Sequence, residues 1–106
     1  MKRIGFLLKV RPDKLEEYKE HHTRVWPELL EAHRRTGWHN YSLFMGEDGL
    51  VFGYFETPHS YRAAVEAMEK EEINARWDEF MAPCLEAVNA ATGEIMVELE
   101  QVFHLD

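Results

Sequence analysis

The chain has 106 residues, a formal net charge of −8 and a single cysteine, Cys84. Its acidic balance argues against nucleic-acid and anionic-membrane partners, and no apolar run reaches the ~18 residues that a transmembrane helix needs. One cysteine cannot form an internal disulfide and fits a reducing cytoplasm. The length is that of one domain, so we expect residues 1–106 to form a single unit. Cys84 follows Pro83 in an apolar neighbourhood, where we expect a buried, inert thiol.

The N-terminal part predicts a strand followed by a helix. Apolar side chains recur at every second position over residues 3–10, as on a strand with one buried face. A helix should begin near Asp13, because Asp13 and Glu16 have the spacing of a capping box. Pro27 cannot donate a hydrogen bond into the preceding turn, so the helix should kink or restart there. Gly37 should end it.

This helical segment places three ring systems at four-residue intervals: Tyr18, His22 and Trp26. Residues four apart lie on one helix face. His22 also falls within the apolar repeat of the segment, so its imidazole should point inward, where it can transfer protons at neutral pH. The structural alternative is a hydrogen-bonded core histidine. Trp26 is most simply a packing anchor beside Pro27.

Two strands should follow at residues 38–45 and 50–57, joined by the turn sequence GEDG. A second helical region should run from Pro58 to about Val88, in two pieces broken near EKEE, and a final strand should span residues 95–105 with an irregularity near Glu100. The order is βαββαβ, an α+β, ferredoxin-like arrangement in which helices cover one face of an antiparallel sheet.

Large apolar side chains also occupy both faces of the predicted strands. The adjacent pairs Phe6 with Leu7 and Leu43 with Phe44 must point to opposite faces. A sheet that is apolar on both faces and covered on only one should pair with a second sheet. We therefore expect a homodimer formed through the uncovered faces.

Two further segments carry candidate ligand-binding residues. On the last helix, Trp77 offers either core packing or a flat surface for the apolar face of a sugar. Arg76 and Asp78 flank it and can hydrogen-bond polar ligand edges. In the HNY triplet, strand alternation should place His39 and Tyr41 on one face and Asn40 on the other. Tyr41 then either lines a pocket or serves as a cross-strand aromatic.

The sequence offers no recognisable metal or nucleophile motif. His21 and His22 are adjacent and point in different directions, and no pair has the HExxH or Cys/His spacing of a zinc site. A glycine-rich phosphate loop and a GxSxG elbow are also missing. We therefore expect no metal and no cofactor, and a chemistry limited to proton transfer.

Taken together, these motifs resemble the L-rhamnose mutarotase family. The resemblance covers nearly the whole chain and rests on Tyr18, His22, WPEL at residues 26–29, HNY, RW at residues 76–77 and the closing ELEQVFHLD. It implies a dimeric ferredoxin-like fold that interconverts the α and β anomers of a deoxy-sugar pyranose without a cofactor. It further implies His22 as the proton donor, and Tyr18, Tyr41 and Trp77 as residues lining the sugar site.

The chain departs from the family pattern at two places on the edge of the implied site. Asp78 stands where members often have a second tryptophan, and NAATGEIM replaces a Pro- and Asn/Asp-rich turn. L-fucose or another aldose is therefore an alternative substrate. Two other readings compete: a sugar-binding module without catalysis, and a dimeric ferredoxin-like monooxygenase or haem-degrading protein with His22 as iron ligand.

Overall fold

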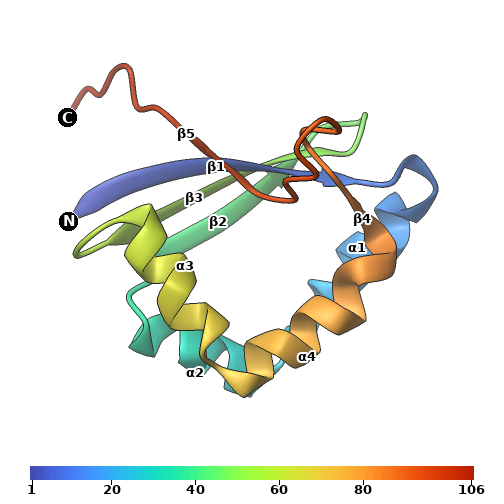
Figure 1. Cartoon of the computed structure of the whole chain (residues 1–106), viewed down its shortest axis with the longest axis horizontal. Coiled ribbons are helices and arrows are strands. Elements are labelled where there is room, and N and C mark those ends of the chain that lie inside the picture. Colours follow the sequence, from blue (N-terminus) through green and yellow to red (C-terminus); the bar gives the residue numbers. More distant parts are fainter.

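A computed structural model describes residues 1–106 as a curved antiparallel sheet with all helices on one side (Figure 1). The elements in chain order are β1 (Lys2–Val10), the 3₁₀ turn η1 (Pro12–Lys14), α1 (Leu15–His21), α2 (Pro27–Arg35), β2 (His39–Met45), β3 (Leu50–Thr57), α3 (Tyr61–Glu69), α4 (Glu72–Met81), the 3₁₀ turn η2 (Ala82–Cys84), β4 (Leu85–Glu86) and β5 (Val97–Leu99). This is the predicted α+β, ferredoxin-like βαββαβ order, with the last strand in two pieces.

The sheet is built around β1, which lies in its centre. The strand order is β2-β3-β1-β4, and β5 also pairs with β1. β1 and β3 are antiparallel from Lys2 opposite Thr57 to Lys9 opposite Leu50. The predicted GEDG turn joins β2 and β3, with Gly49 at φ 87° and its N–H donating to the Gly46 carbonyl at 3.0 Å.

The first helical segment is divided, and its N-terminus differs from the prediction. Residues Pro12–Lys14 close a 3₁₀ turn, so Asp13 lies inside that turn and the N-cap of α1 is Lys14, without a side-chain cap. The predicted capping box is therefore wrong. The restart at Pro27 is confirmed, since Pro27 occupies the first turn of α2. Of the three rings at four-residue intervals, only Tyr18 therefore lies within a helix, α1, while His22 is the C-cap of α1 and Trp26 is the N-cap of α2.

The second helical region breaks as predicted at Lys70, between α3 and α4. Its expected extension to Val88 is wrong. The chain passes through η2, and Leu85 then pairs with Val10 as part of the sheet. Pro83 contributes to this early ending, because it has no N–H to continue the α-helical ladder.

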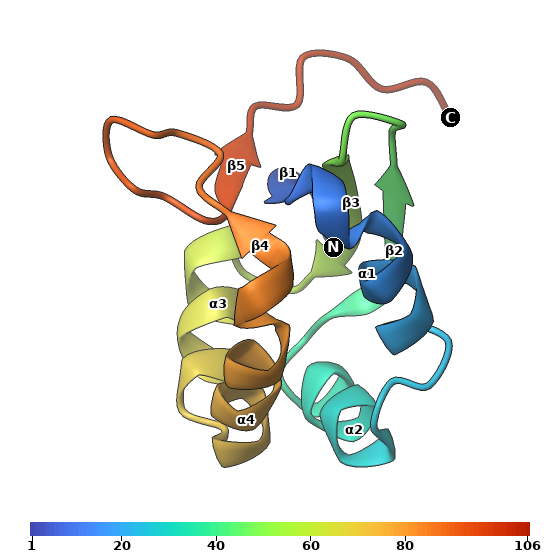
Figure 2. The ribbon, with the colours of Figure 1, turned by 90° about the vertical axis from the view of Figure 1, so that its right-hand side faces the viewer.

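The predicted final strand is much shorter than expected. Only Val97–Leu99 pairs with β1, and the chain then leaves the sheet on the side away from the helices (Figure 2). Val102, Phe103 and Leu105 are 84%, 78% and 79% exposed. Alternating apolar residues form a strand only where there is a surface for them to cover, and this chain supplies none there.

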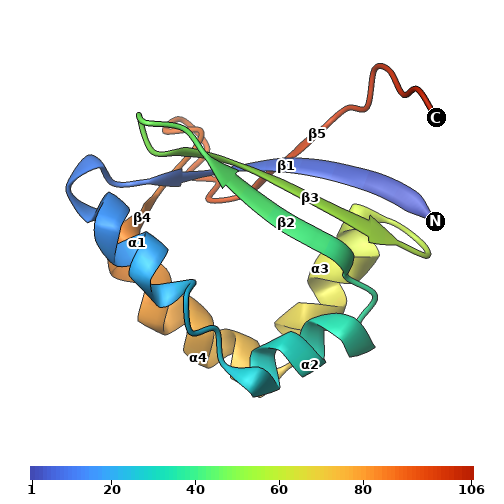
Figure 3. The same ribbon diagram turned by 180° about the vertical axis from the view of Figure 1, so that it is seen from behind.

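The view from behind shows the helices along one side of the sheet (Figure 3), and the buried core residues come from both layers. Phe6 and Phe55 are fully buried, and Trp38 stacks on Phe55 with ring centroids 3.9 Å apart. Cys84 is also fully buried, as predicted. None of the helices is both long and apolar enough to span a membrane.

Candidate functional site

A cavity of about 490 Å³ lies between the concave sheet face and the helices. All five residues predicted for the site line it, from α1 and its C-terminal cap, from β2 and from α4: Tyr18, His22, Tyr41, Trp77 and Asp78. The remaining lining residues are mostly apolar: Phe6, Leu8, His33, Trp38, Leu43, Val65, Met68, Glu69, Asn74, Met81, Ala82, Leu85, Ile95 and Met96. An apolar enclosure with a few convergent polar groups is the usual form of a small-molecule site.

His22 lies at the C-terminal cap of α1, where its ring is fixed by its own helix. Its Nδ1 lies 2.9 Å from the carbonyl oxygen of Tyr18. A carbonyl only accepts, so Nδ1 carries the proton and Nε2 is the nitrogen left to exchange protons. Burial lowers the pKa of His22, with His21 adding to the effect and the Tyr18 hydrogen bond opposing it. The ring also packs at a tilt of 35° against that of Tyr18, with centroids 4.4 Å apart.

Both tyrosines of the cavity are neutral hydroxyls at physiological pH. Burial raises the pKa of Tyr18 to about 12 and that of Tyr41 further still. Tyr41 keeps 36% of its surface exposed although its ring packs on Phe6 and Phe55, because part of its surface faces the open cavity. A neutral phenol can donate a hydrogen bond to a ligand oxygen.

A β-bulge turns Tyr41 toward the cavity. The register passes from His39 opposite Glu56 to Ser42 opposite Tyr54, so two residues of β2 face one of β3. His39 and Tyr41 therefore lie on opposite faces, and the predicted shared face is wrong. Asn40 adopts φ 49° within the bulge, and its side-chain amide donates to Glu56 at 3.0 Å.

Trp77 forms the wall opposite α1. Its indole meets the His22 imidazole edge to face, with centroids 5.6 Å apart. Trp26 lies outside the cavity and packs against Trp77 and Phe80 at 5.0 and 5.3 Å. It is thus the predicted packing anchor, and it supports the cavity wall from behind.

Asp78 contributes the carboxyl group next to Trp77. Burial, and secondarily the charge of Glu69, raises its pKa, and the amide of Asn74 donates to it at 3.4 Å. Arg76 is not among the lining residues. It is exposed and pairs with Glu72 one turn away at 2.9 Å, so only one of the two polar neighbours of Trp77 reaches the cavity.

Sequence reasoning did not single out His33, which also lines the cavity. Its Nδ1 lies 3.0 Å from the Leu29 carbonyl, the same bond that His22 makes to Tyr18, and burial lowers its pKa. Its ring lies 5.3 Å from that of Tyr41. The signal was present, because His33 lies four residues after the buried Leu29 and shares its helix face.

Comparison with known proteins places this geometry in a family. A family model described as L-rhamnose mutarotase matches residues 3–105. Proteins named L-rhamnose mutarotase from Oceanobacillus iheyensis and Bacillus subtilis are each 36% identical over the full length of both chains.

Solved structures agree with the sequence comparison. The crystal structure of an L-rhamnose mutarotase from Formosa agariphila matches with a TM-score of 0.82 and 26% identity over the whole of both chains. Rv0793 from Mycobacterium tuberculosis matches at a TM-score of 0.58 and 13% identity, over 98% of this chain and 97% of that one, which shows a shared fold alone. The chain belongs to the L-rhamnose mutarotase family, whose members are carbohydrate isomerases that interconvert anomers.

Proposed function

We propose that this protein interconverts the α and β anomers of L-rhamnose, with His22 as the proton donor and without a cofactor. The observation that carries the proposal is the position of His22. Its Nδ1 is held by the Tyr18 carbonyl, and its ring lines a cavity of about 490 Å³ together with Tyr18, Tyr41 and Trp77. The substrate class is taken from the relatives that match over their full length, which are named L-rhamnose mutarotase.

Anomer exchange requires one proton to be delivered and one to be removed. His22 in its imidazolium form gives the Nε2 proton to the ring oxygen, while the anomeric hydroxyl loses its proton to a second group in the cavity. The bond between C1 and the ring oxygen breaks, which leaves an aldehyde. Rotation about C1–C2 and closure on the other face return both protons. A positioned acid or base typically accelerates such a step about 10²- to 10⁴-fold.

The other cavity residues bind and orient the sugar. Tyr18 and Tyr41 donate hydrogen bonds to sugar oxygens, which their neutral state allows. Trp77 packs its indole against the C–H face of the ring, and Asp78 accepts from a sugar hydroxyl. Asp78 lies at the position where the family resemblance predicts tryptophan, so it also bears on which sugar is preferred.

Replacing Trp77 with alanine should weaken sugar binding by roughly tenfold, because it removes the flat apolar surface under the ring. Titration of the sugar, followed by the intrinsic fluorescence or by calorimetry, measures this change. Trp77→Phe keeps an aromatic plane, so its affinity for the sugar should lie between those of the wild type and of Trp77→Ala. Unchanged affinity in Trp77→Ala for every active sugar would remove Trp77 from the site.

The preferred sugar is tested by magnetisation-exchange NMR across L-rhamnose, L-fucose and common aldoses. The expected result is fastest catalysed exchange with L-rhamnose. Faster exchange with L-fucose or another aldose would transfer the assignment to that sugar. Binding without any accelerated exchange would instead identify a sugar-binding module.

We further propose that the protein is a homodimer paired through the sheet face that the helices leave open. Phe44 and Phe52 lie on this face, 61% and 40% exposed, with ring centroids 6.4 Å apart. Leu7 and Val97 are paired in register on the same face. Contiguous apolar surface of this kind marks an association site.

The Phe52→Glu substitution should convert the dimer to a monomer, because pairing would bury two carboxylates against apolar surface. Light scattering coupled to size exclusion measures the mass. Leu30→Glu is the matched control, since Leu30 is 41% exposed on α2, away from the sheet. A wild-type monomer at micromolar concentration, or equal effects of both substitutions, would contradict the dimer.

A cytoplasmic location is the last part of the proposal. It is supported by the single cysteine, Cys84, which is unpaired and buried. Proteins of oxidising compartments more often use their cysteines in disulfides.

A further inference from the structure

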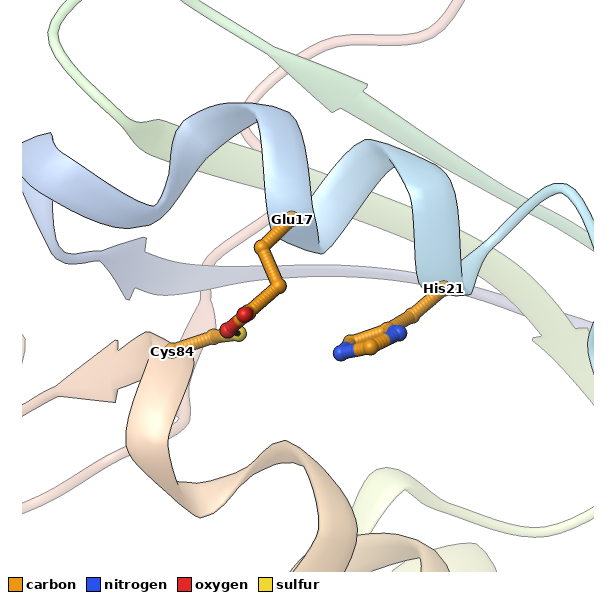
Figure 4. A group of neighbouring side chains, drawn as sticks. All are labelled: Glu17, His21 and Cys84. Carbon is orange, nitrogen blue, oxygen red and sulfur yellow. Dashed lines mark hydrogen bonds between the residues drawn. The ribbon is translucent and has the colours of Figure 1, made fainter.

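Three side chains of metal-ligating type meet where α1 packs against η2. Glu17 and His21 lie four residues apart on α1, and Cys84 comes from η2 at the end of α4 (Figure 4). One ligand atom from each lies within 4.8 Å of the other two. No sequence motif predicts this group, because Cys84 is distant in the chain from Glu17 and His21 and only the fold brings the three together.

The thiol and the carboxylate already interact. The Cys84 Sγ–H donates to Glu17 Oε2 at 3.2 Å. This bond lowers the pKa of Glu17, and burial together with the same bond raises the pKa of Cys84 to about 11. Lys14 is the only cation paired with the carboxylate, at 3.7 Å. The group thus contains one negative charge, on the Glu17 carboxylate, and one proton that a metal ion can displace, on the Cys84 thiol.

Each donor is held on a defined part of the fold. His21 lies against Phe80, with ring centroids 4.3 Å apart. The carbonyl of Cys84 accepts from the Arg11 N–H at 2.8 Å, which ties η2 to the end of β1. Glu17 keeps 45% of its side chain exposed, which leaves the group open to solvent on the Glu17 side.

We propose that Glu17, His21 and Cys84 bind a Zn²⁺ ion, with water as the fourth ligand. Thiolate, imidazole and carboxylate are the ligands that Zn²⁺ takes, at about 2.0–2.3 Å in a tetrahedron. Three ligands in that tetrahedron lie roughly 3.3–3.8 Å apart, so side-chain rotation suffices to close the present spacing. On binding, the Cys84 S–H proton leaves to solvent as the Zn–S bond forms.

Such an ion would fasten together the two walls of the cavity. Glu17 and His21 adjoin Tyr18 and His22 on α1, and Cys84 follows the helix that carries Trp77. A ligand that binds only the folded protein stabilises it by mass action. Bound Zn²⁺ should therefore raise the midpoint of thermal unfolding, and this holds whether or not the protein acts on a sugar.

The test is a Co²⁺ titration of the full-length, chelator-treated and reduced protein without sugar. The expected result is one equivalent bound, with an absorption band from thiolate-to-cobalt charge transfer, lost when Zn²⁺ displaces it. Cys84→Ser should abolish the band. His21→Gln should weaken binding by more than the 10- to 100-fold typical of losing an outer-shell partner, and Glu17→Gln should also weaken it.

His59→Gln, outside the group, is the matched control and should bind as the wild type does. Both α1 substitutions replace solvent-accessible side chains, so they keep the test informative if Cys84→Ser does not fold. Absence of the charge-transfer band in the wild type would overturn the site. So would an unchanged affinity and an unchanged Zn²⁺-induced thermal shift in His21→Gln and Glu17→Gln, which would indicate a thiol acting alone.

Discussion

The His22→Ala variant is expected to lose catalysed anomer exchange while it remains folded. The substitution removes the only ring nitrogen that our proposal assigns to proton delivery, and the loss of a positioned acid typically costs about 10²- to 10⁴-fold. Magnetisation-exchange NMR at equilibrium measures the rate directly, because α and β anomers give separate signals. Circular dichroism and the mass in solution establish that the variant keeps its fold and its oligomeric state.

His39→Ala is the matched control, since His39 lies on the opposite sheet face from Tyr41 and outside the cavity lining. It should retain wild-type exchange. If His22→Ala is folded and as active as the wild type, His22 is a core residue, which is the alternative that helical periodicity also allowed.

The pH dependence supplies an independent signature of the same group. Burial lowers the pKa of His22 below its ordinary value of 6.5. The imidazolium that donates the proton is therefore abundant only below that lowered pKa and declines as the pH rises through it. The rate should fall along a limb whose apparent pKa lies below 6.5, and this limb should be absent from the residual exchange of His22→Ala.

The second large effect concerns stability and is expected from Gly53→Ala. A Cβ at Gly53 would lie within 3.0 Å of three ring atoms of Phe6, closer than real Cβ contacts come. Phe6 is fully buried, so its ring cannot swing away without moving the core. Overpacking of this kind costs about 1–3 kcal/mol. Each kcal/mol lowers the thermal midpoint by roughly 4–8 °C for a domain of this size.

The double substitution Phe6→Leu with Gly53→Ala separates this clash from other causes. Because the smaller side chain removes the ring that the new methyl meets, the two changes together should cost less than their sum. Gly46→Ala is the control, since its Cβ would meet the exposed side chain of Asp48 at 3.1 Å and no buried ring. Strict additivity of the two changes would contradict the proposed contact.

Much of the fold could be predicted because its signals are local. The alternation over residues 3–10, the GEDG turn and the proline at residue 27 each report on a few neighbouring positions, and each recurs in the structure as β1, a hairpin and the start of α2. Their order along the chain indicated the ferredoxin-like arrangement, and the family resemblance implied the same fold. Tyr18, His22, Tyr41 and Trp77 were found because each belongs to a motif on which the resemblance rests, whereas Asp78 was found as the neighbour of Trp77.

The errors come from contacts between distant parts of the chain. Leu85 reads as the end of a helix, but pairing with Val10 draws it into the sheet. Two-residue alternation misplaced His39 because the bulge depends on how β2 meets β3. His33 escaped notice because a single histidine on a helix does not reveal which cavity it borders. The closing residues of the chain read as a strand, although no partner strand is there to receive them.

The cavity is bordered both by packed helices and by the excursion between β4 and β5. Its reactive wall is carried by α1 and α4, which form part of the packed core. Its rim, with Ile95 and Met96, lies at the end of the excursion between β4 and β5. A single isolated bridge, Asn89 to Glu94, spans that excursion. Substitutions in this excursion can therefore alter which sugar enters the cavity while the proton-transfer residues and the sheet stay unchanged. Sugar preference can in this way change without a change in the reaction.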